Sequence, residues 1–355
     1  MARLPSPRVL AELMRGGHLR ARMRSARDGL TAVRVQAIAA AIDIGLLDAV
    51  AGGAGSTAEL ARRLGVADLD LLDAYLRVLA AAGLVTGDGR WQLTRFGRAV
   101  VEDDAVRASY QGFGSYHTDV YRDMAPVLRG GPRRRDTTEQ GEVIARLSAA
   151  ISPFIRDRVV RTVNERRPRR VLDIGCGTGQ YLSAMLEAAP TATGIGLDAD
   201  ADAAALAERT LRDRGQAGRA TVAAADLRTA LATGHPAALR DGIDVALMAN
   251  VIYYEPVDER VELLGSIAGL LSPGGALVIV TTFSGPQFFS RHLDLVLRAQ
   301  EGRMELPAAE VLVGQLREAG LEPEPLEPMG PPSAALGSVT AVRPAVEPVG
   351  GAEHA

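Results

Sequence analysis

One glycine-rich stretch, residues 170–180, constrains the fold of this chain more than any other. Its apolar run includes Asp173 near its end, and three glycines then alternate with small residues. A helical pattern follows over residues 181–188, so the stretch predicts a strand, a glycine-rich turn and a helix. This arrangement presents backbone N–H groups at a helix N-terminus, and glycine lets a ligand approach the main chain closely. The sequence therefore predicts an α/β domain with a ligand site at this turn.

The spacing of these glycines distinguishes between the known nucleotide-binding turns. A dinucleotide fingerprint needs Gly-x-Gly-x-x-Gly, but its last place is Gln180 when counted from Gly175 and Leu182 when counted from Gly177. A P-loop is excluded because no Lys follows the glycines. What remains is Asp-x-Gly-x-Gly-x-Gly. The acid suits a ligand's ammonium group and the helix N-terminus suits a carboxylate, and S-adenosylmethionine carries both on one carbon beside its sulfonium.

From residue 169 onward, strand and helix patterns alternate, which predicts a parallel, doubly wound sheet. The expected strands are 171–174, 193–197, 220–225, 243–248 and 276–281. Three of them lead into a polar side chain, namely Asp198, Asp226 and Asn250. Such sheets bind ligands at the carboxyl ends of their strands, so we expect these side chains to share one site. A carboxylate at Asp198 has the spacing that accepts both ribose hydroxyls, a feature that dehydrogenases share.

The turn and the order of the polar strand ends resemble the class I S-adenosylmethionine-dependent methyltransferases. The Ser-Pro-Gly-Gly turn at 272–275, just before the last expected strand, is also typical of that family. The resemblance implies a Rossmann-like methyltransferase sheet in which Asp226 accepts from the adenine amino group and Asn250 lines the methionine portion. S-adenosylhomocysteine is then the product. The cofactor-binding residues expected are Asp173, Gly175, Cys176, Gly177, Gly179, Asp198, Ala199, Asp226, Leu227, Asn250 and Val251.

The N-terminal part predicts a smaller, mainly helical domain. Residues 56–59 read Ser-Thr-Ala-Glu, a capping box; a second helix starts at Asp68, and two short strands flank Gly-Asp-Gly at 87–89. Helices followed by a hairpin form a winged-helix pattern, which resembles the dimerisation domain of small-molecule O-methyltransferases. The helix that would enter DNA carries three Asp against one Arg, so phosphate would repel it. We therefore expect a homodimer and consider nucleic-acid binding unlikely.

Five segments are expected in order along the chain. They are an Arg-rich arm at 1–30, the winged-helix dimerisation domain at 31–108, a helical linker and substrate-pocket roof at 109–164, the methyltransferase domain at 165–345 and a disordered tail at 346–355. The roof assignment follows from the resemblance, and an aromatic core under a helix pair is the alternative. Within the linker, the Gly-Gly-Pro and arginine run at 130–136 predicts a solvated loop.

Composition narrows the remaining classes. The single cysteine, Cys176, excludes an intrachain disulfide, and its place among the glycines favours a packing role over a nucleophilic one. The net charge of −3 does not suggest a nucleic-acid binder. No apolar run reaches membrane-spanning length and no signal-peptide core is present, so we expect a cytoplasmic protein with no membrane partner.

The residues that follow Asn250 depart from the resembling family. Winged-helix O-methyltransferases commonly carry His-Asp-Trp here, with the His as base, and in this chain Tyr253 falls at the place of that His. Tyrosine titrates near 10 and is a poor base at pH 7. The acceptor is then already acidic, or an amine, or the base comes from elsewhere. The catalytic candidates are Tyr253, Tyr254, Glu255, His292 and His117.

The favoured function is methyl transfer from S-adenosylmethionine to a small-molecule, secondary-metabolite acceptor, with O-methylation first. C-methylation of a 2-oxo acid or enol, carboxyl methylation and N-methylation stay open, as do the acceptor's identity and its attacking atom. No Asp and Asn cluster suited to Mg²⁺ is recognisable, so no metal is expected. Two other classes are a ligand-sensing DNA-binding regulator, which the acidic helix disfavours, and an NAD(P) oxidoreductase, which the missing glycine disfavours.

Overall fold

The computed structural model describes residues 6–15, 17–53, 55–139 and 141–345. The chain forms two compact units: Met1–Met124 with Gln140–Ala150, and Ala125–Glu139 with Ile151–Ala355. The segment expected as one helical linker, 109–164, is thus shared between the units. The expected tail at 346–355 and the first residues of the expected N-terminal arm lie outside the described residues. In the part of the chain that the structure describes, no helix has both the length and the apolar character needed to cross a membrane.

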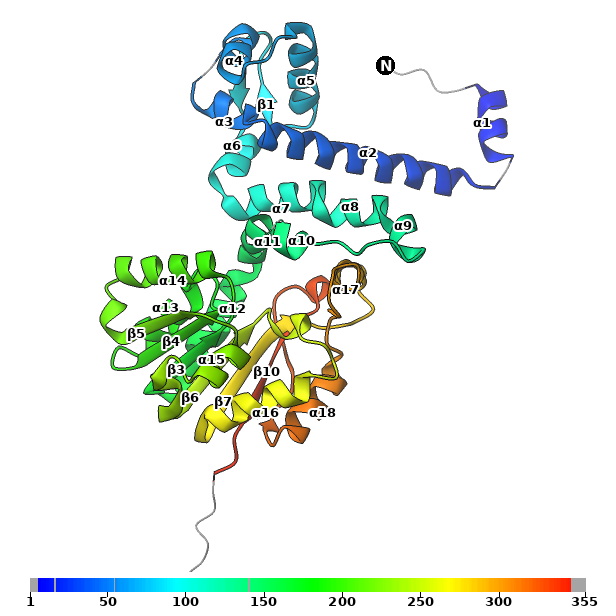
Figure 1. Ribbon diagram of the computed structural model, residues 1–355. Helices are drawn as coiled ribbons and strands as arrows, with labels where there is room; N and C mark the ends of the chain where they lie inside the picture. The colour runs from blue at the N-terminus through cyan, green and yellow to red at the C-terminus, as the bar shows by residue number, and fades with distance from the viewer. Residues whose placement is uncertain (1–5, 16, 54, 140, 346–355) are drawn as a thin grey trace, which may run out of the picture. The chain divides into compact units, whose positions relative to one another are not determined.

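In its described residues, the first unit has helices and one hairpin (Figure 1). Its elements are α1 (Pro7–Met14), α2 (Leu19–Asp43), α3 (Leu46–Ala51), α4 (Thr57–Leu64), α5 (Leu69–Ala81), β1 (Val85–Thr86), β2 (Gln92–Leu93), α6 (Arg95–Glu102), α7 (Asp104–Gly114), α8 (Tyr116–Arg122) and α11 (Gly141–Ser148). The short helix α9 (Met124–Leu128) lies at the boundary between the units, as does the 3₁₀ turn η1 (Ala149–Ile151).

Local signals explain why the first unit folds as the sequence predicts. The Ser56 hydroxyl accepts from the Glu59 N–H at 3.2 Å while the Glu59 carboxylate accepts from the Ser56 N–H at 2.8 Å, so the capping box that opens α4 is confirmed. Asp68 caps α5 by accepting from the Leu71 N–H at 2.9 Å. The expected hairpin is confirmed as well, with β1 antiparallel to β2. Trp91 is 2% exposed and completes the core of this winged-helix arrangement.

The second unit is built on an eight-stranded sheet of order β5-β4-β3-β6-β7-β10-β8, with β9 also paired to β10 (Figure 1). The strands are β3 (Arg170–Ile174), β4 (Thr193–Asp198), β5 (Ala220–Ala224), β6 (Ile243–Ala249), β7 (Leu271–Thr282), β8 (Glu322–Pro323), β9 (Glu327–Pro328) and β10 (Leu336–Val342). Strands β3 to β7 are parallel, and β10 runs antiparallel to β7. The doubly wound, Rossmann-like class predicted from the sequence is confirmed.

Two helices of this unit come before β3, and the others alternate with the strands from β3 to β7 or follow β7. They are α10 (Asp136–Glu139), α12 (Ser152–Arg166), α13 (Gln180–Ala188), α14 (Ala201–Asp213), α15 (Leu227–Thr233), α16 (Arg260–Leu270), α17 (Phe288–Arg298) and α18 (Ala309–Glu318), with 3₁₀ turns η2 (Ala217–Arg219), η3 (Ala237–Asp241), η4 (Ile252–Tyr254) and η5 (Pro332–Ala334). One expectation differs: residues 272–275, expected as a turn, belong to β7. In the register with β6, Ile243 pairs with Leu271 and Val245 pairs with Ala276, so these four residues form an irregularity between two paired positions.

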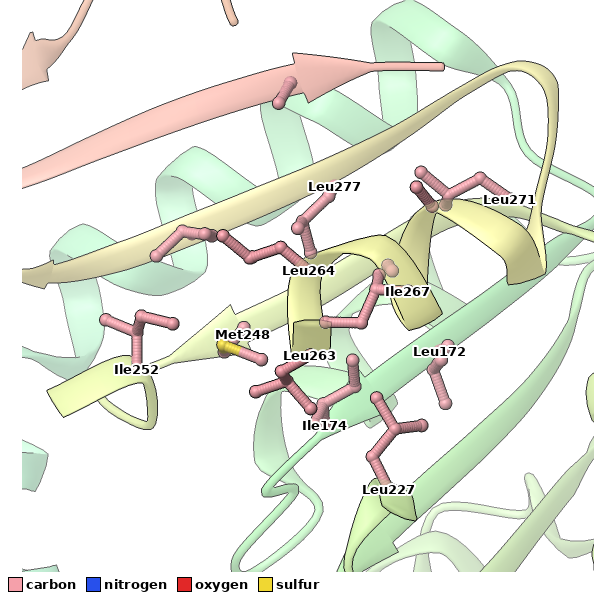
Figure 2. Packing of buried hydrophobic residues seen from close by; sticks show 14 of the residues in the cluster. Leu172, Ile174, Leu227, Met248, Ile252, Leu263, Leu264, Ile267, Leu271 and Leu277 are labelled. Atoms are coloured by element: carbon pink, nitrogen blue, oxygen red, sulfur yellow. The ribbon is translucent and has the colours of Figure 1, made fainter. Parts of the chain in front are cut away.

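Both faces of the sheet are buried, which is why its strands are continuous apolar runs. On one face, strand residues pack against α15, α16 and α18; Figure 2 shows Leu172, Ile174 and Met248 near Leu263 and other apolar side chains of α16. On the other face, β3, β6 and β7 pack against α12 and α13. Each fully buried Leu or Ile contributes about 1.5–3 kcal/mol, so the sheet is a rigid platform that fixes its strand ends.

The loop at 130–136 was expected to be solvated, and for Asp136 this prediction was wrong. Asp136 is 2% exposed, and Arg134 donates to its two carboxylate oxygens at 2.7 and 2.8 Å. The side chain of Gln300 accepts from the Asp136 N–H at 2.8 Å and donates to its carboxylate at 2.9 Å. A charge run gives no sign of a buried partner that lies 164 residues further along the chain.

Candidate cofactor site

The glycine-rich turn after β3 has three left-handed residues with different surroundings. Gly175, Gly177 and Gly179 have φ of +70°, +52° and +75°. A Cβ on Gly175 would lie 2.4 Å from a methyl of Val251, and one on Gly179 would lie 2.9 Å from the backbone of Ala207. A Cβ on Gly177 would meet nothing within 4 Å. The outer glycines therefore permit close packing, whereas Gly177 presents bare main chain to open space.

Asp173, on β3 just ahead of this turn, is a buried carboxylate with one unused oxygen. It is 0% exposed, its Oδ2 atom accepts from the Leu182 N–H at 3.1 Å, and its Oδ1 atom is buried without a hydrogen-bond partner. Burial raises the pKa of Asp173 to about 7; the Leu182 N–H opposes this and the charge of Asp198 adds to it. A buried acceptor left unpaired is costly, so this oxygen suits a ligand's cationic donor.

Asp198 ends β4 and is fixed by two backbone donors. Its Oδ2 atom accepts from the Gly177 N–H at 2.8 Å, and its Oδ1 atom accepts from the Asp200 N–H at 3.0 Å. Ala199 follows directly, and Asp200 caps α14. The structure thus brings Asp198 against the glycine-rich turn, as the sequence predicts for residues that share one edge of the sheet.

Asp226 begins the helix after β5 and is exposed. One of its carboxylate oxygens accepts from the Thr229 N–H at 2.7 Å and the other from the Thr229 hydroxyl at 3.1 Å. A carboxylate has about four acceptor positions, so this cap leaves capacity for a ligand. Leu227 is 4% exposed and belongs to the core of the sheet.

Asn250, directly after β6, has a strained backbone. Its φ is +57°, and its N–H donates to the Val280 carbonyl at 2.8 Å. A non-glycine residue in the left-handed region costs energy and is often found at functional sites. The next residue, Val251, packs against Gly175 and joins this strand end to the glycine-rich turn.

Cys176 is a packing residue. It is 3% exposed, and its sulfur lies 3.0 Å from the position of a Cβ on Gly196. Burial raises the pKa of its thiol, and its N–H donates to the Leu197 carbonyl at 2.9 Å. A buried thiol that stays protonated is inert.

The two tyrosines after Asn250 occupy different environments. Tyr253, which the resemblance predicts to fall at the place of the family's His, is 9% exposed and packs with Leu297 and Leu306. Tyr254 is 37% exposed, and its ring centroid lies 4.7 Å from that of Tyr253. Desolvation by the surrounding protein raises the pKa of Tyr254. A hydrogen bond with Tyr253 opposes this shift, and the charge of Asp198 adds to it. Tyr254 therefore stays protonated at neutral pH and can donate a hydrogen bond.

The other candidate bases are differently placed. The Glu255 carboxylate is held by Arg228 at 2.9 Å. His292 on α17 is 7% exposed, and burial lowers its pKa, so it is neutral at pH 7. His117 lies in the first unit, 2% exposed, with its ring 4.7 Å from that of Phe113.

One charged residue that contacts the segment after β6 was not predicted from the sequence. Arg260, at the start of α16, is 1% exposed and donates to two backbone carbonyls. The only signal for it was an arginine at the start of a largely apolar helix, which is indistinguishable in sequence from a solvated one.

Comparisons with known proteins place this geometry in a family. Residues 172–277 match the model of a methyltransferase domain, and residues 30–103 match that of an O-methyltransferase dimerisation domain. Demethylspheroidene O-methyltransferase of Rhodobacter capsulatus is 26% identical over 316 residues, covering 81% of this chain and 74% of the relative. N,N-dimethyltransferase OxyT of Streptomyces rimosus is 25% identical over 289 residues, covering 76% of this chain and 80% of the relative.

A solved structure described as PigF with SAH, the demethylated product S-adenosylhomocysteine, superposes with a TM-score of 0.71 at 17% identity. It covers 90% of this chain and 99% of that one. The chain is a methyltransferase of the class I, Rossmann-like type. It belongs to the S-adenosylmethionine-dependent methyltransferases that carry an N-terminal O-methyltransferase dimerisation domain, and S-adenosylmethionine is its cofactor.

Proposed function

We propose that the turn after β3 and the neighbouring strand ends hold S-adenosylmethionine. The unused oxygen of buried Asp173 receives the ammonium group, and the bare main chain of Gly177 lies against the methionine portion together with Asn250. Asp198 accepts hydrogen bonds from the ribose hydroxyls, and Asp226 accepts one from the adenine amino group. When bound, the cofactor supplies a methyl group on a good leaving group, so the protein's task is to hold and orient the acceptor.

The acceptor that this site suits best is a small secondary metabolite whose hydroxyl is acidic enough to ionise without a strong base. The observation that carries this proposal is the pair of tyrosines after Asn250: Tyr253 stands at the place expected for the family's His base, and the adjoining Tyr254 is a protonated hydroxyl whose pKa the charge of Asp198 helps to raise. The Glu255 carboxylate forms an ion pair with Arg228, and His292 is buried. Tyr254 orients the acceptor oxygen by donating a hydrogen bond, and the acceptor's own acidity makes it nucleophilic.

An amine acceptor is the second candidate, because a neutral amine also needs no strong base before it attacks. The similarity to an N,N-dimethyltransferase supports it. The two candidates differ in the charge of the form that reacts: an acidic hydroxyl reacts as its anion, whereas an amine reacts as the neutral base.

A panel assay tests this proposal. Purified protein and S-adenosylmethionine are incubated with phenols and enols of graded pKa between about 5 and 10 and with arylamines, and products are identified by mass spectrometry. At pH 7 we expect methyl ethers, with kcat/KM rising as the acceptor pKa falls below the assay pH. Products that carry the methyl group only on a carbon, a carboxylate or a nitrogen atom would contradict methylation of a hydroxyl. Equal rates for phenols of pKa 5 and 10 would reveal a base and overturn the base-free mechanism.

The protein is proposed to act as a homodimer through its first unit. The dimerisation-domain match supports this, as do the exposed apolar side chains of α2: Met23, Leu30 and Val33 are 66%, 72% and 64% exposed. A DNA-binding role is disfavoured, because Arg77 of α5 is already paired with Asp73 at 2.8 Å and with Asp88 at 3.3 Å.

A further inference from the structure

Arg260 is a buried cation whose described partners are carbonyl groups. Its Nε atom donates to the Glu255 carbonyl at 3.0 Å and its Nη2 atom donates to the Glu305 carbonyl at 2.8 Å. Within the described ranges, no carboxylate forms an ion pair with it. Burial lowers the pKa of Arg260, although the charges of Glu305 and Glu255 oppose this. Burying a charge without a direct counter-ion is unfavourable, so a leucine at this position would be expected unless the guanidinium has a task.

The two carbonyls belong to the segments that surround Tyr253 and Tyr254. Glu255 directly follows the 3₁₀ turn η4 that carries both tyrosines. From the opposite segment, the Glu305 N–H donates to the Tyr253 carbonyl at 3.3 Å, and the next residue, Leu306, packs against the Tyr253 ring. One hydrogen bond therefore joins the tyrosine turn to Glu305 directly, and Arg260 adds a bridge of two more between the Glu255 and Glu305 carbonyls.

This clamp acts on Tyr254 through its neighbour. With the Tyr253 ring packed against Leu306 and its carbonyl held by Glu305, the adjoining Tyr254 has little freedom to move. Its hydroxyl is further restrained by the hydrogen bond with Tyr253. A displacement of about 1 Å at a group that orients a reactant can reduce the rate about 100-fold.

We propose that Arg260 is a positioning residue that fixes Tyr254 for methyl transfer and thereby helps to select the acceptor. The proposal rests on the role assigned above to Tyr254. It predicts that loss of the guanidinium affects the acceptor and leaves the cofactor unaffected, because the hydrogen bonds of Arg260 within the described residues go to the Glu255 and Glu305 carbonyls and none goes to the glycine-rich turn or to the ends of β4 and β5.

Arg158 offers a matched control for burial. It is also a buried arginine of the second unit, 7% exposed; it donates to the hydroxyls of Ser338, Thr162 and Thr340 between α12 and β10, and unlike Arg260 it forms an ion pair, with Glu327 at 3.2 Å. Its removal should destabilise the fold without touching the tyrosine turn. If Arg260 had a purely structural role, replacing Arg260 or Arg158 by Met would have the same effects on Tm and on kcat/KM.

The experiment compares Arg260→Met, Arg260→Lys, Arg158→Met and Tyr254→Phe in the full-length protein. Titration calorimetry gives the Kd for S-adenosylhomocysteine, and steady-state kinetics give kcat and KM with the best acceptor from the panel. We expect Arg260→Met to lower kcat/KM for the acceptor about 10- to 100-fold with the Kd within about twofold of wild type. Arg260→Lys, which keeps the charge on a single donor nitrogen, should recover part of this loss, and it provides the test if Arg260→Met does not fold. Arg158→Met should lower Tm and leave kcat/KM unchanged.

The double variant separates this inference from the function on which it rests. If Arg260 acts through Tyr254, adding Arg260→Met to Tyr254→Phe should lower kcat/KM for the acceptor little further, because the hydroxyl that Arg260 positions is already absent. Losses that multiply, or equal kinetic effects of Arg260→Met and Arg158→Met, would overturn the positioning role. A Tyr254→Phe variant with unchanged kinetics would instead overturn the assignment of Tyr254, whatever Arg260→Met does.

Discussion

The backbone N–H of Gly177 donates a 2.8 Å hydrogen bond to Oδ2 of Asp198, and this bond joins the glycine-rich turn to the end of β4. It fixes the carboxylate proposed to hold the ribose against the main chain proposed to hold the methionine portion. The charge of Asp198 also reaches Asp173, where it helps to keep the pKa high, and Tyr254, where it opposes ionisation. A single carboxylate thus shapes both the cofactor side and the acceptor side of the site.

Gly177→Ala should weaken cofactor binding more than it weakens the fold. A Cβ at this position would project into open space, so the only folding cost is the left-handed backbone, about 1–2 kcal/mol. The same methyl would occupy the space proposed for the cofactor. We expect the Kd for S-adenosylhomocysteine, measured by calorimetry, to rise at least about tenfold, equivalent to 1.4 kcal/mol.

Gly179→Ala provides the comparison for this variant. It has the same backbone cost, but its Cβ would lie 2.9 Å from the Ala207 backbone, so the packing between the turn and α14 must shift. We expect its Tm to fall further than that of Gly177→Ala. Wild-type affinity in Gly177→Ala would show that the turn does not contact the cofactor.

Asp173 predicts a pH dependence of cofactor binding. Its pKa of about 7 in the free protein means that the site is protonated, and so uncharged, in mildly acidic solution. An ammonium group pairs with the ionised form, so binding below pH 7 must release a proton. The affinity for S-adenosylhomocysteine should therefore rise between pH 5.5 and 7.5, by up to about tenfold per pH unit on the acidic side.

Asp173→Asn separates this effect from stability. Because the folded pKa lies above the unfolded value near 3.9, the folded protein holds more protons between about pH 4 and 7, and stability falls as the pH rises through that window. The Asn variant does not lose stability in this way, so its Tm at pH 8 without cofactor should equal or exceed that of the wild type. Its affinity for S-adenosylhomocysteine should be weaker than that of the wild type and independent of pH. Calorimetry in buffers of different ionisation enthalpy would detect the proton; its absence in wild type would contradict the assignment.

The sequence predicted the elements whose signals are local. The ends of β4, β5 and β6 are visible because each apolar run stops near a polar residue, and α4 and α5 are visible through their capping residues Ser56 and Asp68. Three features had no local signal. The turn η4 is too short for any periodicity to show which tyrosine is buried, Asp136 is buried by the distant Gln300, and Arg260 is buried by carbonyls that no residue type identifies.

The proposed dimer predicts the effect of charges on α2. Leu30 and Val33 are largely exposed, so Leu30→Glu with Val33→Glu should cost the isolated chain little but place two carboxylates in an apolar interface. We expect light scattering after gel filtration to give half the wild-type mass. Val311→Glu on α18, where the valine is 48% exposed, is the control and should keep the wild-type mass. A wild-type protein that elutes as a monomer would remove the proposal.

Asp136→Asn should loosen the contact between residues 134–136 and the end of α17. The side chains of Arg134 and Asp136 are 14% and 3% exposed, and breaking a buried pair of this kind costs about 3 kcal/mol. Hydrogen exchange is the suitable probe, because the Arg134 N–H donates to Ala299 at 2.9 Å and the Glu301 N–H donates to Arg134 at 2.8 Å. We expect these amides to exchange roughly 100-fold faster in the variant.

The control for this prediction is Asp157→Asn, which breaks the exposed pair of Asp157 with Arg161 and should change exchange by less than about threefold. The only tryptophan, Trp91, lies in the first unit and provides a second control. Its fluorescence should follow the unfolding of the first unit and stay unchanged in Asp136→Asn, since the buried pair belongs to the second unit. Equal exchange in Asp136→Asn and Asp157→Asn would mean that Gln300 alone holds the segment, because its side chain bonds to the main chain of Asp136 as well as to the carboxylate.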